Sequence, residues 1–157
     1  MTESDSGWTD VDRSLMQAAL DEADLALADG EVPVGAVVTL AGRIVGRGHN
    51  RTIRDCDPTA HAEVVAIREA AAARGNHRLP DATMYVTLEP CAMCVGALVQ
   101  ARIRRLVFGS YDPKAGAAGS ILDLTAERRL NHRIEVNGGL MASECALPLT
   151  EFFAAKR

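Results

Sequence analysis

Residues 83–109 read TMYVTLEPCAMCVGALVQARIRRLVFG, a run that contains two strand patterns with a helix pattern between them. Thr83–Leu88 is rich in β-branched and aromatic side chains, which favours a strand. A Glu-Pro pair interrupts this pattern, and Pro90 suits the first position of a helix that extends to about Ala101. Arg105–Gly109 predicts the next short strand. The strand–helix–strand order indicates an α/β domain.

The flanking sequence extends this alternation in both directions. A leading hairpin is predicted because the tight turn at Ala41-Gly42 separates two strand patterns. The last two strands are predicted to be parallel, because a helical stretch rather than a two-residue turn connects them. The remaining predicted elements are a helix from Asp10 to about Ala28, strands over Val34–Leu40 and Arg43–Gly48, a helix from about Ala60 to Arg74 with Thr59 as N-cap, a helical stretch near Leu122–Leu130, a strand over Ile134–Val136 and a helix over Ser143–Lys156.

Length and composition predict a single domain over residues 1–157, with residues 1–9 as a flexible N-terminal extension. Hydrophobic residues make up 48% of the chain, which argues against disorder. No apolar run approaches the roughly 18–20 residues that span a bilayer. The acidic start MTESDSGWTD is unlike a secretory or transit signal. A soluble cytoplasmic protein is therefore expected.

Charge is distributed unevenly along the chain, whose formal net charge is −4. Residues 1–31 carry nine acidic side chains and one basic side chain, so the remainder is net positive. The basic residues of that remainder occur in bunches that either contact phosphate groups or form an ordinary solvated surface. These bunches are Arg102/Arg104/Arg105, Arg128/Arg129/Arg133 and Lys156/Arg157.

The segment Pro90-Cys91-Ala92-Met93-Cys94 carries the strongest chemical signal. Cysteines three residues apart at the start of a helix share one face, and the helix dipole favours the thiolate form that binds a metal. A structural zinc site needs four protein ligands, and a second CxxC is absent from the sequence. A redox pair and an inert buried pair remain as alternatives. If the pair binds a metal, a third ligand must come from elsewhere in the chain.

His61 is the best candidate for that third ligand, because it begins a helix that follows a strand. Helix N-termini of this kind converge at the carboxyl ends of the strands. His49, His77 and His132 lie in predicted loops or irregular stretches. Three ligands leave the fourth tetrahedral position for water, which is the pattern of a catalytic zinc.

Glu63 is two residues from His61, so on a helix the two side chains point about 200° apart. Joint binding of one metal is therefore disfavoured. From the first turn, the longer glutamate side chain can still reach a metal-bound water and move its protons. The alternative is an ordinary acidic residue that the helix dipole favours at an N-terminus.

The pattern His61-Ala62-Glu63 followed by Pro90-Cys91-Ala92-Met93-Cys94 matches the H-x-E…P-C-x-x-C signature of the zinc nucleobase deaminases. Within that superfamily, further segments resemble the bacterial tRNA-specific adenosine deaminases. These segments are EVPVGAV, DPTAHAE, TLEPCAMC, VFGSYDPKAGAAGS, LNHR and ECALPLTEFF, and they cover nearly the whole chain. The resemblance implies a three-layer α/β/α cytidine-deaminase-like fold with a five-stranded mixed sheet, one Zn2+ per subunit and a homodimer.

The activity implied by the resemblance is deamination of the wobble adenosine to inosine in an arginine tRNA anticodon. Hydroxide activated by zinc attacks C6 of a flipped-out adenine, while Glu63 carries the proton. The metal ligands are then His61, Cys91 and Cys94. The implied substrate contacts are Asn50 on the nucleoside, Val34, Ala62 and Leu88 around the base, Asp112 and Lys114 on neighbouring nucleotides, and Arg51, Asn131, His132, Arg133 and Phe153 on the RNA-facing surface.

One loop departs from the pattern that this family usually shows. Tyr111 and Pro113 flank Asp112, where smaller side chains are more familiar. Because proline fixes a backbone angle, contacts outside the pocket are expected to differ.

Two other functions stay open: a free-base or nucleoside deaminase of guanine or cytosine type on the same fold, and a zinc-stabilised RNA-binding module without catalysis. The predicted parallel pair of final strands argues against the cytidine branch but not against the guanine branch. The polar loop YDPKAGAAGS favours an RNA substrate.

Overall fold

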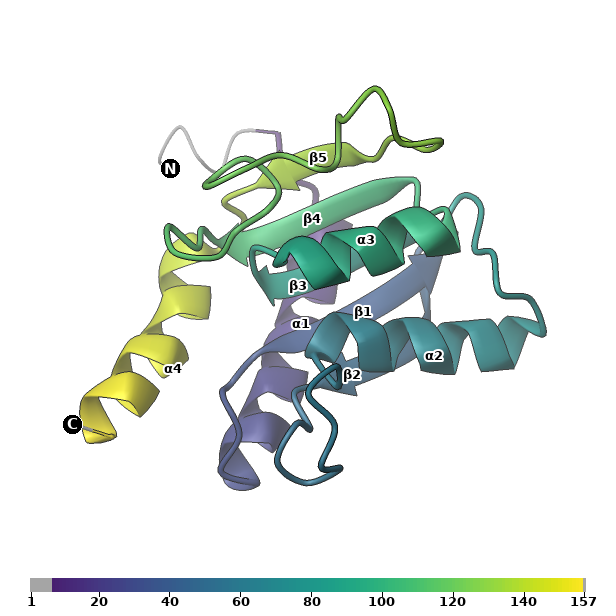
Figure 1. Cartoon of the computed structure of the whole chain (residues 1–157). Helices are drawn as coiled ribbons and strands as arrows, with labels where there is room; N and C mark the ends of the chain where they lie inside the picture. Colours follow the sequence, from purple (N-terminus) through teal and green to yellow (C-terminus); the bar gives the residue numbers. More distant parts are fainter. Residues whose placement is uncertain (1–6, 157) are drawn as a thin grey trace.

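A computed structural model describes residues 7–156 of the chain. The predicted N-terminal extension falls mainly on residues 1–6, which lie outside the described residues, and Thr9 is already the N-cap of the first helix. The elements in chain order (Figure 1) are α1 Asp10–Ala28, β1 Gly35–Leu40, β2 Arg43–His49, α2 Ala62–Arg74, β3 Thr83–Leu88, α3 Ala92–Ala101, β4 Arg105–Ser110, β5 Glu135–Gly138 and α4 Ala142–Ala155.

Within residues 7–156 the strands form one five-stranded sheet in the order β2-β1-β3-β4-β5. Strand β1 is antiparallel to both β2 and β3, whereas β3, β4 and β5 are parallel to one another. The predicted mixed sheet and the parallel final pair are therefore confirmed. This topology brings the carboxyl ends of β2, β3 and β4 to one edge of the sheet, together with the start of β1.

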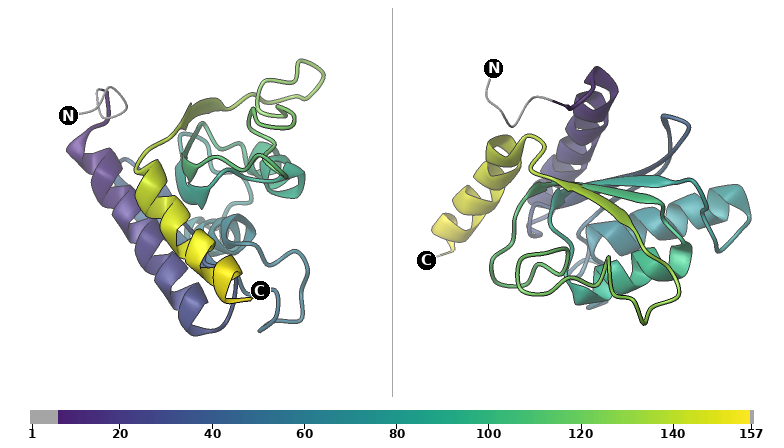
Figure 2. Two further views of the ribbon diagram at one scale, coloured as in Figure 1. Left: turned by 90° about the vertical axis from the view of Figure 1, so that its left-hand side faces the viewer. Right: turned by 90° about the horizontal axis from the view of Figure 1, so that it is seen from above.

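Helices cover both faces of the sheet, which gives the predicted three layers. Figure 2 shows α1 and α4 side by side on one face and α2 and α3 on the other. Strand β3 explains the arrangement, because Met84 and Val86 enter the larger core beneath α2 and α3, while Tyr85 between them enters the core beneath α1. Both faces of a central strand are thus buried, as its almost continuous apolar sequence requires.

Two glycines of β2 let helix α2 lie directly on the sheet. A Cβ atom at Gly46 would come within 2.4 Å of the Ala66 carbonyl oxygen, and one at Gly48 within 2.4 Å of the Ala62 carbonyl oxygen. These contacts with helix backbone fix the height of α2 above the strand. They also fix its first turn, which directly follows His61.

The helix predicted near Leu122–Leu130 is wrong, since the segment forms turns. The carboxylate of Asp123 accepts hydrogen bonds from the backbone N–H and the hydroxyl of Thr125, which is buried. A local side-chain acceptor of this kind competes with the helical hydrogen-bond ladder. The irregular crossover still returns the chain to the correct edge for a parallel β5.

Among the helices of residues 7–156, none combines the length and the apolar character needed to cross a membrane.

Candidate active site

The site is built at two helix N-termini that face each other. His61 is the N-cap of α2 and Cys91 is the N-cap of α3, and neither side chain caps its own helix. Thr59, the predicted cap of α2, instead donates its hydroxyl and N–H hydrogen bonds to Asp57. Pro90 precedes the N-cap of α3 and so lies two positions before Ala92, the first residue of the helix that it was predicted to begin. Both corrections leave the His61 and Cys91 side chains directed into the site.

His61, Cys91 and Cys94 form a metal-binding group, in which the three ligand atoms lie within 4.8 Å of one another. The distance from His61 Nδ1 is 3.7 Å to the Cys91 sulfur and 3.4 Å to the Cys94 sulfur. With Zn–S bonds of about 2.3 Å and Zn–N bonds of about 2.0–2.1 Å, tetrahedral ligands lie about 3.5 Å apart. The donor set and its spacing therefore fit zinc with three protein ligands, which leaves one coordination position for substrate chemistry.

The electrostatics of the two thiols suit a metal ligand pair. Hydrogen bonds from the Cys94 thiol and the His61 ring lower the pKa of Cys91 to about 4. The hydrogen bond to Cys91, together with burial, raises the pKa of Cys94. Among the protein groups alone, the pair thus holds one thiolate and one thiol. A bound dication displaces the remaining proton, because metal binding requires the thiolate form.

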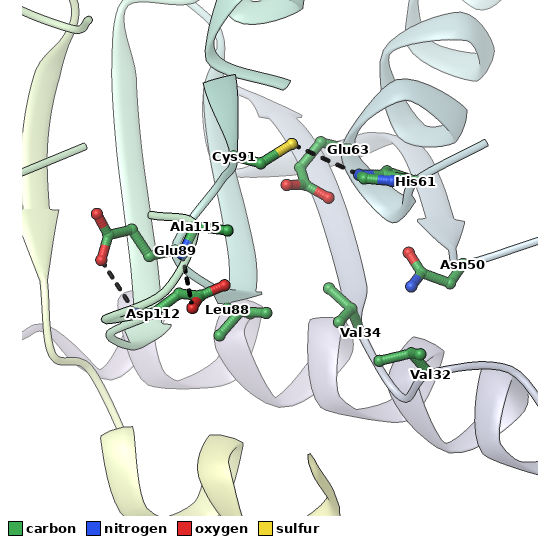
Figure 3. Close-up of a pocket in the computed structure, with 10 residues that line it drawn as sticks. All are labelled: Val32, Val34, Asn50, His61, Glu63, Leu88, Glu89, Cys91, Asp112 and Ala115. Carbon is green, nitrogen blue, oxygen red and sulfur yellow. Dashed lines mark hydrogen bonds between the residues drawn. The ribbon is translucent and has the colours of Figure 1, made fainter. Parts of the chain in front are cut away.

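Glu63 lies beside this group but outside it. Its side chain is 4% exposed, and Figure 3 shows its carboxyl group directed into the pocket next to Cys91 and His61. Burial raises the pKa of Glu63 to about 7, and the neighbouring Cys91 charge acts in the same direction. A carboxyl group with this pKa can both accept and release a proton near neutral pH.

A pocket of about 160 Å³ opens above the metal-binding group at the carboxyl edge of the sheet. Its volume is below the roughly 300–1,000 Å³ of drug-sized ligand sites, so it admits a single ring system. The residues that line it are Val32, Val34, Asn50, His61, Glu63, Leu88, Glu89, Cys91, Asp112 and Ala115 (Figure 3).

Four predicted substrate residues, Val34, Asn50, Leu88 and Asp112, thus line the pocket. Ala62 is buried directly behind it, where its N–H donates to the Asn50 side chain. The other predicted contacts lie outside the pocket lining. Lys114 is exposed on the loop after β4, Phe153 is exposed on α4, and Arg51 pairs with Asp55. The remaining three precede β5: Asn131, His132 and Arg133.

Residues 131–133 lie at the opposite edge of the sheet from the pocket. They precede the first residue of β5, which pairs with the first residue of β4, whereas the pocket follows the last residues of β3 and β4. His132 is additionally held by a 2.7 Å hydrogen bond from its Nε2 to the Ile103 carbonyl. Contact of these residues with RNA therefore stays a prediction for a surface remote from the base pocket.

Sequence reasoning missed Glu89, Val32 and Ala115 in the lining. Glu89 was interpreted only as part of the pair that ends a strand. Its position between a buried strand and the CxxC segment was a usable signal, because ligand sites form where parallel strands end. Val32 and Ala115 carry no such signal.

Comparisons with known proteins agree with this geometry. Residues 9–110 match the cytidine and deoxycytidylate deaminase zinc-binding region. The chain is 48% identical over 150 residues to the tRNA-specific adenosine deaminase of Haemophilus influenzae, which covers 95% of this chain and 87% of that protein. It is 45% identical over 146 residues to the enzyme of the same name from Bacillus subtilis, covering 93% and 91%.

Solved structures show the same relationship at the level of the fold. A structure from a study of A-to-I editing by tRNA:A34 deaminases matches with a TM-score of 0.84 and 48% identity, covering 87% of this chain and 99% of that one. A guanine deaminase from Nitrosomonas europaea matches with a TM-score of 0.73 and 26% identity, over 90% and 84% of the two chains. With a zinc-binding region matched over most of its length and relatives near half identity along nearly all of it, the chain belongs to the zinc-dependent cytidine and deoxycytidylate deaminase family, on the branch of the tRNA-specific adenosine deaminases.

Proposed function

We propose that this protein hydrolyses the wobble adenosine of a tRNA anticodon to inosine and ammonia, with an arginine tRNA as the expected substrate. The observation that carries the proposal is the buried carboxyl group of Glu63 beside the His61/Cys91/Cys94 group. A purely RNA-binding module has no use for a buried titratable group at its metal site. The names of the relatives near half identity supply the substrate class.

His61, Cys91 and Cys94 would hold the zinc, which would make a water molecule acidic enough to supply hydroxide near neutral pH. Glu63 takes the proton from that water and delivers it to N1 of the adenine ring. Glu63 then takes the proton of the new C6 hydroxyl group and passes it to the departing amino group, which leaves as ammonia while C6 becomes the carbonyl carbon of inosine. The raised pKa of Glu63, about 7, suits both the uptake and the release.

The remaining lining residues hold the base. Val34 and Leu88 offer apolar contacts to the ring, and the Asn50 amide offers a hydrogen bond to the nucleoside. Because the pocket has room for one ring system, the wobble base enters it alone after leaving the anticodon stack. Asp112 and Lys114 then face the neighbouring nucleotides from the loop after β4.

We also propose that the protein acts as a homodimer in the cytoplasm, where tRNA is found. The dimer is supported by exposed apolar side chains next to the site, Met93 at the start of α3 and Ile121 and Leu122 in the loop that follows β4. That loop is tied to the same end of α3 by the hydrogen bond from the Ala117 N–H to the Pro90 carbonyl, 2.8 Å long. Exposed apolar groups of this kind favour contact with a partner. Light scattering of the purified protein at several concentrations measures the mass directly.

The deciding experiment is incubation of the zinc-loaded protein with an anticodon stem-loop that carries adenosine at the wobble position. Inosine is read out by nuclease digestion and chromatography. A matched stem-loop with the adenosine moved to the next anticodon position tests the register, and free adenosine, cytosine and guanine test the need for RNA. Inosine in the first stem-loop alone supports the proposal. Ammonia from guanine with no inosine in either stem-loop replaces it with a guanine deaminase, the activity named for a relative of 26% identity.

A further inference from the structure

Glu89 has a fully buried carboxylate that accepts hydrogen bonds from the loop after β4. Its Oε1 accepts from the Asp112 N–H at 3.1 Å and from the Ser120 hydroxyl. Its Oε2 accepts from the N–H groups of Ala118 at 3.0 Å and Ser120 at 3.1 Å. Segment 111–120, here called the β4 loop, is therefore wrapped around one carboxylate.

The packing of the β4 loop shows how closely it fits this carboxylate. A Cβ atom added to Gly116 would come within 2.3–2.5 Å of the carboxyl atoms of Glu89. Figure 3 shows the Glu89 side chain directed toward the loop, with a hydrogen bond to Asp112, rather than toward the metal-binding group. Glu89 is nevertheless only two residues before Cys91. The loop is thus anchored to the same short segment that supplies a metal ligand.

Glu31 has the same arrangement on the other side of the pocket. Its carboxylate is 1% exposed and accepts from the Thr52 hydroxyl at 3.3 Å, the Ile53 N–H at 3.1 Å and the Arg54 N–H at 2.9 Å. These donors belong to segment 50–57, here called the β2 loop, whose first residue is the pocket residue Asn50. Glu31 itself precedes Val32, another lining residue.

We propose that Glu31 and Glu89 are positioning residues, each of which holds one rim loop of the pocket in the geometry that receives the substrate. Glu31 sets the β2 loop that presents Asn50, and Glu89 sets the β4 loop that presents Asp112. The inference rests on the proposed function for the identity of the substrate. The hydrogen-bonding scheme itself does not depend on that identity.

A carboxylate is the side chain that this task requires. Each of the two accepts from at least three donors and donates to none, and an ionised carboxylate is an acceptor at all of its lone pairs. Glutamine has nearly the same shape, but its NH₂ group would face backbone N–H donors. One or two buried donors would then lack a partner, which costs more than the hydrogen bond itself. A loop that already has its binding conformation also avoids the entropy loss of becoming ordered when RNA binds.

The test uses Glu31→Gln and Glu89→Gln in the full, zinc-loaded chain, with amide hydrogen exchange read residue by residue by NMR. Glu89→Gln is expected to accelerate exchange at Asp112, Ala118 and Ser120 by about tenfold or more, the factor for one lost hydrogen bond to a charged group. Exchange at Ile53 and Arg54 stays unchanged and is the internal control. Glu31→Gln is expected to give the reverse pattern. Unchanged exchange in both loops, or equal acceleration in both loops by either variant, overturns the proposal.

Kinetics with the wobble stem-loop add a readout that a general loss of stability does not produce. Because His61, Cys91, Cys94 and Glu63 are untouched, both variants are expected to keep their zinc and to raise KM by about tenfold while kcat changes less, since the lost loop order is restored on binding. A fall in kcat with unchanged KM contradicts the positioning role. If wild type makes no inosine, the proposed function fails, whereas the exchange result still decides the role of the two carboxylates.

Ser120→Ala and Thr52→Ala cover the case in which a glutamine variant does not fold. Each removes one hydroxyl donor from Glu89 or from Glu31 and leaves the carboxylate and the backbone donors in place. Each is expected to accelerate exchange in its own loop only, by a smaller factor than the glutamine variant. No acceleration in either loop, or acceleration in the loop on the other side, overturns the proposal.

Discussion

The side-chain oxygen of Asn50 accepts a hydrogen bond from the backbone N–H of Ala62 at 3.0 Å. Ala62 is the first residue of α2, so its N–H is one of the donors that a helix leaves without a partner. The bond ties the end of β2 to the turn that carries His61. It also fixes the orientation of the amide, because with Oδ1 held by Ala62 the NH₂ group remains to donate into the pocket.

This orientation predicts different outcomes for two substitutions of Asn50. Asn50→Asp keeps an acceptor for Ala62 but loses the donor, so the melting temperature and zinc content stay close to wild type. Its kcat/KM for the wobble stem-loop falls about 10- to 100-fold, the range for one lost hydrogen bond in a binding site. Asn50→Ala loses both bonds and is expected to melt at a lower temperature as well. Wild-type turnover by Asn50→Asp would mean that the amide does not touch the substrate.

Glu63→Gln is expected to separate binding from chemistry. The glutamine retains the size of the side chain but cannot accept and return a proton, so ammonia release falls by at least about 10²–10⁴-fold. Zinc content, measured by metal analysis, and stem-loop affinity, measured by fluorescence anisotropy, stay near wild type because Glu63 is not one of the three metal ligands and glutamine fills the same space in the pocket. Glu69→Gln, an exposed change on the same helix, is the matched control. Turnover retained by Glu63→Gln would remove the proton shuttle from the mechanism.

How much the sequence predicts depends on the range of the interactions involved. The β3–α3–β4 unit was predicted closely because its strand pattern, its Glu-Pro break and its cysteine spacing are local. The metal-ligand group was predicted because its two short motifs come together whenever both lie at the same end of the sheet. They do so because each motif stands at the N-terminus of a helix that follows a strand, and these strands run in the same direction, so His61 and Cys91 lie at the carboxyl ends of the strands.

The errors and omissions came from interactions that join distant segments. Leu122–Leu130 has helical spacing, yet Asp123 and the buried Thr125 turn the chain instead. Glu31 looks like an ordinary surface acid in the sequence, and although Glu89 stands just before the CxxC segment, the burial of both side chains is visible only once the loops around them are in place. Acidic residues are seldom fully buried without a partner, so no composition rule would have selected these two.

The close contact between Gly48 and α2 makes a further prediction. Gly48→Ala would place its Cβ against the backbone of Ala62 and Ala66, so we expect a loss of about 1–3 kcal/mol in the free energy of unfolding, the usual cost of overpacking. Lifting α2 also moves His61 away from Cys91 and Cys94, which weakens zinc binding. Urea unfolding and competition with a zinc chelator measure the two effects.

Gly96→Ala is the control for this substitution. Gly96 lies inside α3, where an added Cβ meets nothing within 4 Å. Replacing a glycine within a helix by alanine is expected to stabilise the protein by roughly 0.5–1 kcal/mol. Equal changes in the free energy of unfolding for Gly48→Ala and Gly96→Ala would show that crowding against α2 does not cause the loss of stability.

The last prediction concerns acid stability and lies on the face of the sheet away from the pocket. Asp12 of α1 accepts a hydrogen bond from the Tyr85 hydroxyl at 2.6 Å and another from Arg105 at 3.1 Å. Burial by itself would raise the pKa of Asp12, but the hydrogen bonds from Tyr85 and the Thr9 backbone, together with Arg105, outweigh it and hold the pKa below its ordinary value of 3.8. Folding therefore favours the ionised carboxylate.

It follows that Asp12 stabilises the fold fully above its unfolded-state pKa and loses this contribution as pH falls below 3.8 toward its folded-state pKa. Asp12→Asn cannot be ionised and loses the charge-assisted bonds, so near pH 7 it should be less stable by about 2 kcal/mol. Urea unfolding of both proteins at several pH values between 7 and 3 measures the gap, that is, the difference between their free energies of unfolding. We expect a constant gap down to about pH 5 and a narrower one below 3.8, because wild type then protonates Asp12. A gap that widens toward low pH would mean that folding instead favours the protonated acid, and that burial outweighs Tyr85 and Arg105.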